Sequence, residues 1–219
     1  MSNPGYLILG GGGHAAALAE ILIKQKKTII GVVAPEITAG LKIFDSVPQY
    51  LNDDDVLKFS VDQVLLVNGI GAMPRQTLRK KIYTRFSELG YTFATIIADS
   101  AEVSDYSSIG CGAQVMNNCV VNIGTVIAEN TIINTSSSVD HDCNIGAHCH
   151  LAPGSTLSGQ VIIEGNAHIA TGVNVINNIT IGENAIIGVG ANITKSIPSN
   201  SIVYGARSVI KNLGETDDN

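Results

Sequence analysis

Residues 127–162 read IAENTI INTSSS VDHDCN IGAHCH LAPGST LSGQVI, six hexads that each begin with an aliphatic residue. The same spacing extends in both directions without an insertion, so that every sixth residue from Ile97 to Ile193 is Ile, Val or Leu. The residue four places after each of these is small or β-branched, and neither series contains a charged residue. A short, fixed period of this kind indicates a repeat architecture.

Two inward-facing positions in every six residues fit a short strand followed by a corner. Three such hexads would close a triangular coil of 18 residues, and stacked coils would lie about 4.8 Å apart, as strands in a sheet do. The period therefore predicts a parallel β-helix of hexapeptide repeats over residues 97–198, followed by a C-terminal extension over 199–219. Three of the four cysteines, Cys119, Cys143 and Cys149, fall on the inward series and are interpreted as core residues.

Residues 1–96 show a different pattern, in which apolar runs alternate with helical periodicity. We expect a small α/β unit with a parallel, Rossmann-like sheet. The expected elements are strands over 6–9, 28–33, 63–67 and 91–96 and helices over 14–27 and 73–89.

A run of four glycines followed by a histidine, Gly10 to His14, leads into the first of these helices. A glycine turn at a helix N-terminus exposes backbone N–H groups that can bind a phosphate. The acid that a dinucleotide site places after the second strand is replaced by Ala34-Pro35, so a single nucleotide group is the better ligand. A purely structural strand–helix turn is the alternative.

The composition excludes several classes of protein. The chain has 219 residues, 45% of them hydrophobic and 15% charged, which is far from a disordered sequence. A net charge of −6 argues against a nucleic-acid binder. No apolar run is long enough to span a membrane, and we find no secretory signal, which predicts a cytoplasmic protein with reduced cysteines. Between residues 97 and 198 the only basic residue is Lys195, and so uncharged a surface favours an oligomer.

His141 and Asp142 occupy a corner of the predicted coil, pointing away from its interior. An imidazole has a pKa of about 6.5, and a carboxylate beside it raises its basicity, as general-base catalysis requires. Surface polarity without catalysis is the alternative interpretation of this pair. His150 and His168 are 18 residues apart and should stack on successive coils. His148 and His150 lack a third ligand at a zinc-motif spacing, so no metal is expected.

The Gly-Gly-His turn, the hexapeptide solenoid and the stretch from Asn134 to Asp142, NTSSSVDHD, together resemble the bacterial sugar acetyltransferases. This family includes the UDP-4-amino-sugar N-acetyltransferases of bacillosamine-type pathways and the related sialic-acid O-acetyltransferases. The resemblance implies a left-handed coil, a homotrimer with active sites between subunits, and transfer of an acetyl group from acetyl-CoA to the amino group of a UDP-linked 4-amino-deoxy sugar.

The resemblance also implies roles for individual residues. His141 would be the general base and Asp142 would raise its basicity. The acetyl-CoA site would include His150, Gly159, Thr171 and Val189. The sugar-nucleotide site would include Gly12, Gly13, His14, Ala34, Pro35, Gly69 and Asn134. Family members often carry an acidic pair where this chain has Ala34-Pro35, which departs from the family pattern.

Three other functions fit parts of the same sequence. A sialic-acid-type O-acetyltransferase would use the same residues on a hydroxyl acceptor. A zinc enzyme of the carbonic-anhydrase type would use the same solenoid but needs three converging histidines. A non-catalytic trimeric scaffold would leave the glycine turn and the His141–Asp142 corner without a purpose.

Overall fold

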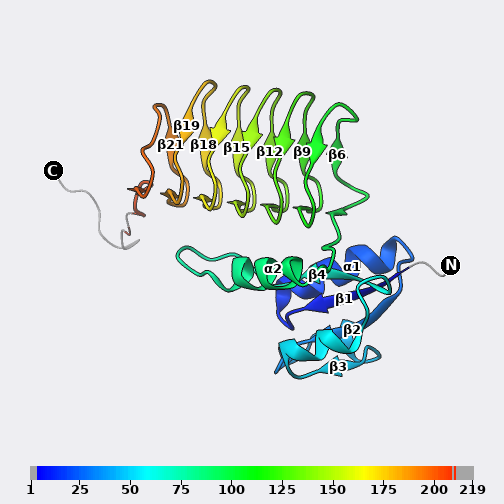
Figure 1. The fold of residues 1–219 in the computed structure, drawn as a ribbon. Helices are drawn as coiled ribbons and strands as arrows, with labels where there is room; N and C mark the ends of the chain where they lie inside the picture. The colour runs from blue at the N-terminus through cyan, green and yellow to red at the C-terminus, as the bar shows by residue number, and fades with distance from the viewer. Residues whose placement is uncertain (1–3, 209, 211–219) are drawn as a thin grey trace.

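The structure is a computed structural model that describes residues 4–208 and 210. These residues fold into two units. A small α/β unit lies along one side of a long parallel β-helix, as Figure 1 shows. Within these residues no helix has both the length and the apolar character needed to cross a membrane.

The N-terminal unit is a four-stranded parallel sheet in the order β3-β2-β1-β4. Strands β1 and β2 are the two inner strands of this sheet, and Leu7, Ile8 and Leu9 of β1 are all buried. Helix α1 packs Leu18 and Leu22 against this sheet. The elements are β1 (Gly5–Leu9), α1 (Gly13–Lys24), β2 (Ile29–Val33), η1 (Lys42–Phe44), β3 (Gln49–Tyr50), η2 (Asp53–Lys58), β4 (Val64–Asn68) and α2 (Leu78–Glu88).

Two predicted elements of this unit are wrong in their extent. The helix expected over 73–89 begins only at Leu78, because Pro74 restricts the residue before it and Arg75 adopts a left-handed φ of 65°. The strand expected over 91–96 is reduced to one bridge between Leu66 and Phe93. After Phe93 the chain leaves the sheet and enters the β-helix at Ile96, and no longer strand forms.

The β-helix has three faces of two-residue parallel strands. Face 1 contains β5 (Ile96–Ile97), β8 (Gln114–Val115), β11 (Ile132–Ile133), β14 (His150–Leu151), β17 (His168–Ile169), β20 (Ile186–Ile187) and β22 (Ile202–Val203). Face 2 contains β6 (Glu102–Val103), β9 (Val120–Val121), β12 (Ser138–Val139), β15 (Thr156–Leu157), β18 (Asn174–Val175) and β21 (Asn192–Ile193). Face 3 contains β7 (Ser108–Ile109), β10 (Val126–Ile127), β13 (Asn144–Ile145), β16 (Ile162–Ile163) and β19 (Thr180–Ile181).

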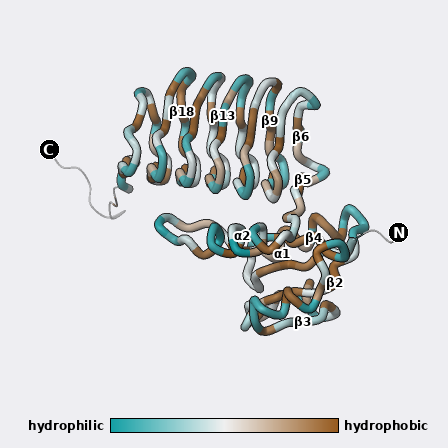
Figure 2. Tube along the Cα trace, in the orientation of Figure 1, coloured by the Kyte–Doolittle hydropathy of each residue, from teal (hydrophilic) through white to brown (hydrophobic). Residues whose placement is uncertain are grey.

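The predicted register is present in the strand pairing. Successive strands of a face pair residues 18 apart, as Ile132 pairs with His150 and His150 with His168. The aliphatic residue of each hexad fills the interior, and Figure 2 shows apolar and polar residues alternating along the coils. The inward cysteines Cys119, Cys143 and Cys149 are buried and free, whereas the free Cys111 is exposed. The residues of the hexad repeat thus form the core of the β-helix.

The β-helix ends differently from the expected boundary at residue 198. Strand β22 pairs Ile202 with Ile186, only 16 residues earlier, so the last coil is two residues short. The pairing of face 1 therefore continues into the segment predicted as a C-terminal extension over 199–219. Residue 209 and residues 211–219 of that segment lie outside the described residues.

The N-terminal unit packs on face 1 of the prism. The Nε2 of His14 donates to the Oε1 of Gln114 at 2.8 Å, and the Nδ2 of Asn68 donates to the Oδ1 of Asn130 at 3.0 Å. We name the three edges of the prism by the faces that meet there. Because the prism is three-sided, the edge between faces 2 and 3, called edge 2–3, lies opposite the N-terminal unit.

Candidate active site

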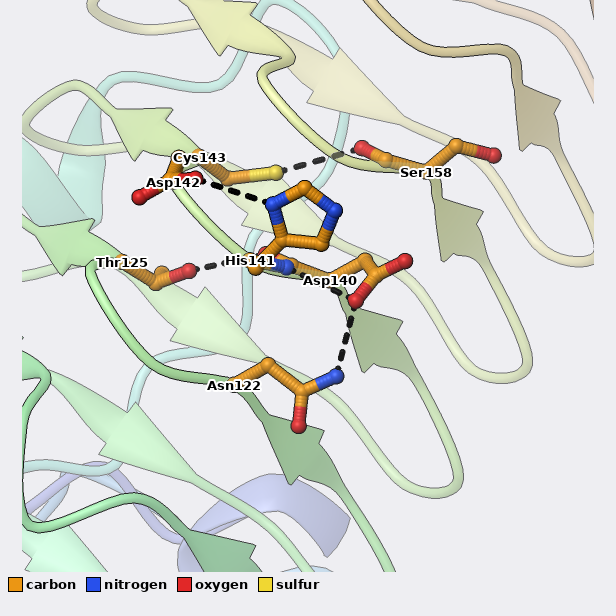
Figure 3. Close-up of polar contacts among 7 residues, drawn as sticks. All are labelled: Asn122, Thr125, Asp140, His141, Asp142, Cys143 and Ser158. Carbon is orange, nitrogen blue, oxygen red and sulfur yellow. Dashed lines mark hydrogen bonds and ion pairs between the residues drawn. The ribbon is translucent and has the colours of Figure 1, made fainter.

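His141 and Asp142 lie on edge 2–3, in the turn between β12 and β13 (Figure 3). The Nδ1 of His141 is 2.9 Å from the Oδ2 of Asp142, and both side chains are exposed, by 49% and 58%. A carboxylate can only accept, so Nδ1 carries the proton and Nε2 keeps its lone pair. The arrangement leaves an unprotonated ring nitrogen at the outer surface, as a general base requires.

The turn itself aims the carboxylate at the ring. Asp142 adopts a left-handed φ of 58°, which breaks the alternation of a flat strand and lets neighbouring side chains meet. Asp140 fixes the other end of the turn, since its Oδ1 accepts from the backbone N–H of His141 at 2.8 Å and from the Nδ2 of Asn122 at 2.9 Å. Asn122 lies one coil below Asp140, so the coil beneath supports the turn.

These contacts shift the pKa values of His141 and Asp140 in opposite directions, and both shifts favour His141 as a base. The hydrogen bond to Asp142 raises the pKa of His141 above its usual value, with smaller contributions from the charges of Asp140 and Asp142. The hydrogen bond from Asn122 lowers the pKa of Asp140, which keeps that carboxylate ionised beside the imidazole.

Two glycines make room for the pair. A Cβ on Gly159, one coil above His141, would lie 2.6 Å from the Nε2 and the Cε1 of the ring. A Cβ on Gly124, one coil below Asp142, would lie within van der Waals overlap of the Oδ1 of Asp142. The imidazole of His141 therefore occupies the space that a side chain on Gly159 would need.

The glycine turn opens helix α1, which begins at Gly13 with Gly12 as its N-cap. Among the described residues no side chain caps this end, so the first N–H groups of the helix keep their unpaired donors. A Cβ on Gly12 or Gly13 would meet nothing within 4 Å, so there is open space beside this turn. His14 is half-buried, with protein atoms close to most of its ring. Burial, followed by the charge of Arg79, lowers the pKa of His14 to about 4, so the ring is neutral near pH 7.

The other residues predicted for this site have structural explanations. Ala34 is 2% exposed and packs against Gly11, while Pro35 is exposed. A Cβ on Gly69 would come within 2.7 Å of the Cβ of Ala15, so this glycine allows α1 to approach β4. Backbone packing accounts for Ala34 and Gly69 without a ligand.

Asn134, His150 and His168 form a cluster on face 1 and its edge with face 2. The Nδ2 of Asn134 lies 3.1 Å from the Nε2 of His150, and the rings of His150 and His168 meet edge-on at 4.9 Å, so the predicted stacking is present. Burial, then the charges around it, lowers the pKa of His150 to about 3. His150 is thus a neutral hydrogen-bonding group near pH 7.

One chain does not bring all of the predicted site residues together. His141, Asp142 and Gly159 lie on edge 2–3, whereas Thr171 and Val189 lie on the edge between faces 1 and 2. The exposed Val189 and Thr171 do belong to successive coils, because the backbone N–H of Gly190 bonds to the carbonyl of Thr171 at 3.0 Å. The predicted acetyl-CoA residues are therefore split between two edges of the prism.

Sequence reasoning missed several residues that hold the site. Asn122 and Gly124 lie 18 residues before Asp140 and Asp142, so the coil period could have identified them. Gln114, Asn68 and Arg79 connect the two units and carry no local motif. Within residues 4–208 and 210, no three His, Cys, Asp or Glu side chains converge as metal ligands.

Comparison with protein families and curated proteins relates the chain to sugar-modifying transferases. Residues 124–159 match the family model described as bacterial transferase hexapeptide (six repeats). The chain is 30% identical over 169 residues to GDP-perosamine N-acetyltransferase of Escherichia coli O157:H7, with 74% of this chain and 73% of the relative covered.

Solved structures agree with this relationship. PerB from Caulobacter crescentus, crystallised with CoA and GDP-perosamine, is 30% identical and has a TM-score of 0.81, covering 96% of this chain and 99% of its own. The acetyltransferase domain of PglB from Neisseria gonorrhoeae, crystallised with acetyl coenzyme A, is 27% identical with a TM-score of 0.84, covering 93% and 97%. The predicted fold and family are confirmed. The chain belongs to the bacterial sugar N-acetyltransferases of the hexapeptide class, acetyl-CoA-dependent enzymes built on a left-handed β-helix with a Rossmann-like N-terminal unit.

Proposed function

We propose that this protein transfers the acetyl group of acetyl-CoA to the amino group of a nucleotide-linked amino sugar, with His141 as the general base. The observation that carries the proposal is the bond from the Nδ1 of His141 to Asp142, which leaves Nε2 free at an exposed edge. Two relatives support an amino sugar on a nucleoside diphosphate, namely GDP-perosamine N-acetyltransferase of Escherichia coli O157:H7 and PerB, which was crystallised with GDP-perosamine.

The chemistry is an aminolysis of a thioester. The amine nitrogen forms a bond to the acetyl carbon, the carbon–sulfur bond breaks, and the Nε2 of His141 takes the proton that the nitrogen loses. The resulting imidazolium is stabilised by Asp142 and returns its proton to the departing thiolate. Removing the base typically costs a factor of about 10² to 10⁴ in rate.

We place the acceptor at the glycine turn and face 1. The N-terminus of α1, which no described side chain caps and which has open space beside Gly12 and Gly13, suits a diphosphate. His14, Asn134 and His150 line the route along face 1. Ala34 and Pro35 provide no carboxylate that could accept a hydrogen bond from a ribose hydroxyl. We therefore expect backbone groups to bind the nucleoside.

We further propose a homotrimer in which each active site uses two chains. The base lies on the edge opposite the face that carries the N-terminal unit, so the base and the acceptor turn of one chain lie on opposite sides of the prism. A neighbouring chain that presents its edge 2–3 to this face 1 would bring base and acceptor together. The same packing would join Gly159 to the residues of the other edge, Thr171 and Val189, around acetyl-CoA.

An acceptor screen tests the reaction. Purified protein is incubated with acetyl-CoA and either GDP-linked or UDP-linked 4-amino sugars, and the acetylated product is detected by mass spectrometry. The GDP-linked sugar is the first choice because of the relatives, and the UDP-linked sugar tests the expectation from the sequence. Turnover of a nucleotide-linked amine that drops by about 10² or more in His141→Ala supports the proposal. Turnover only on hydroxyl groups of sialic acid, or activity unchanged in His141→Ala, contradicts it.

A further inference from the structure

A cavity lies between the two units, away from edge 2–3 of the same chain. It encloses about 250 Å³ between the segment from Ala72 to Lys80 and the prism. The prism side includes His148, His150 and His168, together with the apolar side chain of Ile186. The dyad of His141 and Asp142 does not line it.

The lining of this cavity is strongly basic. Arg75, Arg79 and Lys80 contribute to it, and none of the described lining residues is Asp or Glu. The whole chain carries a net charge of −6, and residues 97–198 contain a single Lys or Arg, Lys195. Three cations gathered here without an acid create a local positive potential in an otherwise acidic protein.

Arg79 lacks the counter-charge that a buried guanidinium normally has. It is 6% exposed, and its Nη1 donates to the carbonyl oxygens of Asn68 and Ile70, both at 2.8 Å. Within the described part of the chain, its Nη2 has no hydrogen-bond partner. Burial lowers the pKa of Arg79 to about 9, so the group is still charged near pH 7. A buried charge with an unpaired donor is costly unless an acceptor reaches it.

The imidazoles of His150 and His148, which line the cavity, also carry N–H donors. The amide of Asn134 donates to the Nε2 of His150, because the Oδ1 of Asn134 is occupied by the backbone N–H of Thr135 at 2.8 Å. The proton of neutral His150 therefore sits on Nδ1. Among the described residues Nδ1 has no hydrogen-bond partner of good geometry, although a weaker contact with the backbone of Ala72 slightly offsets the lowering of the ring's pKa by burial. The Nδ1 of His148 accepts from Asn130 at 2.9 Å, so its free proton is on Nε2.

Two unmatched side-chain atoms belong to described residues that line this cavity, the Nη2 of Arg79 and the Nδ1 of His150. Both are donors, so the missing partner is an acceptor, and the surrounding cations favour one with negative charge. We propose that this cavity is a binding site for a phosphate-type oxyanion, held by Arg79, Lys80 and Arg75 with hydrogen bonds from His148 and His150. Two sources have this chemistry, namely a phosphate of either transfer substrate or a free phosphorylated metabolite. The proposal rests in part on the proposed function, because His150 also lines the acceptor route along face 1. Pyrophosphate binding is measured without acetyl transfer, so failure of the oxyanion site and failure of the transfer reaction are distinguishable.

Inorganic pyrophosphate serves as the probe, titrated calorimetrically into the full-length protein at low salt. The double variant Arg75→Gln/Lys80→Gln removes two cations at exposed positions, which leaves the core contacts of Arg79 in place. Arg85→Gln is the matched control, because Arg85 is on the same helix but pairs with Asp54 and does not line the cavity. The double variant is expected to raise the Kd about tenfold or more, while the control leaves it within about twofold.

The calorimetric titration can support or overturn the proposed oxyanion site. Absence of saturable binding in the unmodified protein, or equal weakening in Arg85→Gln, overturns the proposal. If the unmodified protein binds pyrophosphate, competition experiments identify which molecule supplies the phosphate. Displacement by a nucleoside diphosphate or by CoA assigns the site to a substrate phosphate, and displacement by neither assigns it to a free metabolite.

Discussion

The imidazole of His141 occupies the volume that a side chain on Gly159 would need, since a Cβ there would lie 2.6 Å from Nε2. The two residues are 18 apart and stack on successive coils of edge 2–3. The position of the base is therefore set by the absence of an atom in the coil above, as well as by Asp142 beside it. Gly124 has the same relationship to Asp142 from the coil below.

Substituting Gly159 with alanine is expected to displace the imidazole and lower kcat by about 10² or more, because a small misplacement of a catalytic group is costly. Steady-state kinetics and a crystal structure of Gly159→Ala check both statements. The control is Gly165→Ala on another edge, where the nearest atom would be 3.5 Å from the new Cβ. A Gly159→Ala enzyme as active as Gly165→Ala would contradict this role for Gly159.

Substituting Gly124 with alanine should act on the carboxylate instead of the ring. The new Cβ displaces Asp142, the hydrogen bond to the Nδ1 of His141 weakens, and the pKa of the imidazole falls. Gly124 has a φ of 73°, so Gly172→Ala, with a φ of 67° and no neighbour within 4 Å, controls for backbone strain. The acidic limb of the kcat/KM profile is expected to shift to lower pH in Gly124→Ala alone, and equal shifts in both variants would exclude the mechanism.

Asp142→Asn tests the electrostatic contribution directly. Since the hydrogen bond to Asp142 is the largest cause of the raised pKa of His141, its loss lowers that pKa. In the unmodified enzyme, activity falls as the pH drops through the raised pKa and protonates the base. The variant should lose maximal rate yet keep its remaining activity to lower pH. Asp140→Asn, whose charge contributes less, should shift the limb by a smaller amount, and the reverse order would be inconsistent with the geometry.

The hexad period was sufficient to predict the β-helix, its inward cysteines and the outward position of His141. It was also sufficient, in principle, for Asn122 and Gly124, which follow from subtracting one coil from Asp140 and Asp142. The docking of the N-terminal unit was not predictable, because no motif marks its contacts. His14 and Gln114 are 100 residues apart in the chain, and Asn68 and Asn130 are 62 residues apart. The helix start was misjudged because the left-handed Arg75 follows Pro74, and a helical periodicity does not register such a break.

Acidification is expected to destabilise the fold through its neutral histidines. The pKa of His14 is about 4 in the folded protein and about 6.5 when unfolded, so between these values the unfolded state binds more protons. Stability therefore falls as the pH drops below about 6.5, by on the order of 2 kcal/mol for His14 between pH 7 and pH 5. Urea unfolding of the protein and of His14→Gln at both pH values measures this. A variant that loses as much stability on acidification as the unmodified protein would refute the contribution.

The central claim is that the base of one chain serves the acceptor site of another. His141→Ala and His14→Ala, each impaired on its own, are co-expressed with different tags and purified as mixed oligomers. At equal mixing, a site that takes His14 from one chain and His141 from its neighbour is intact with a probability of one half times one half, or about one quarter. Recovery of about a quarter of the unmodified acetyl-transfer rate is the predicted result, and a mixed oligomer no more active than the two separate variants would contradict the claim.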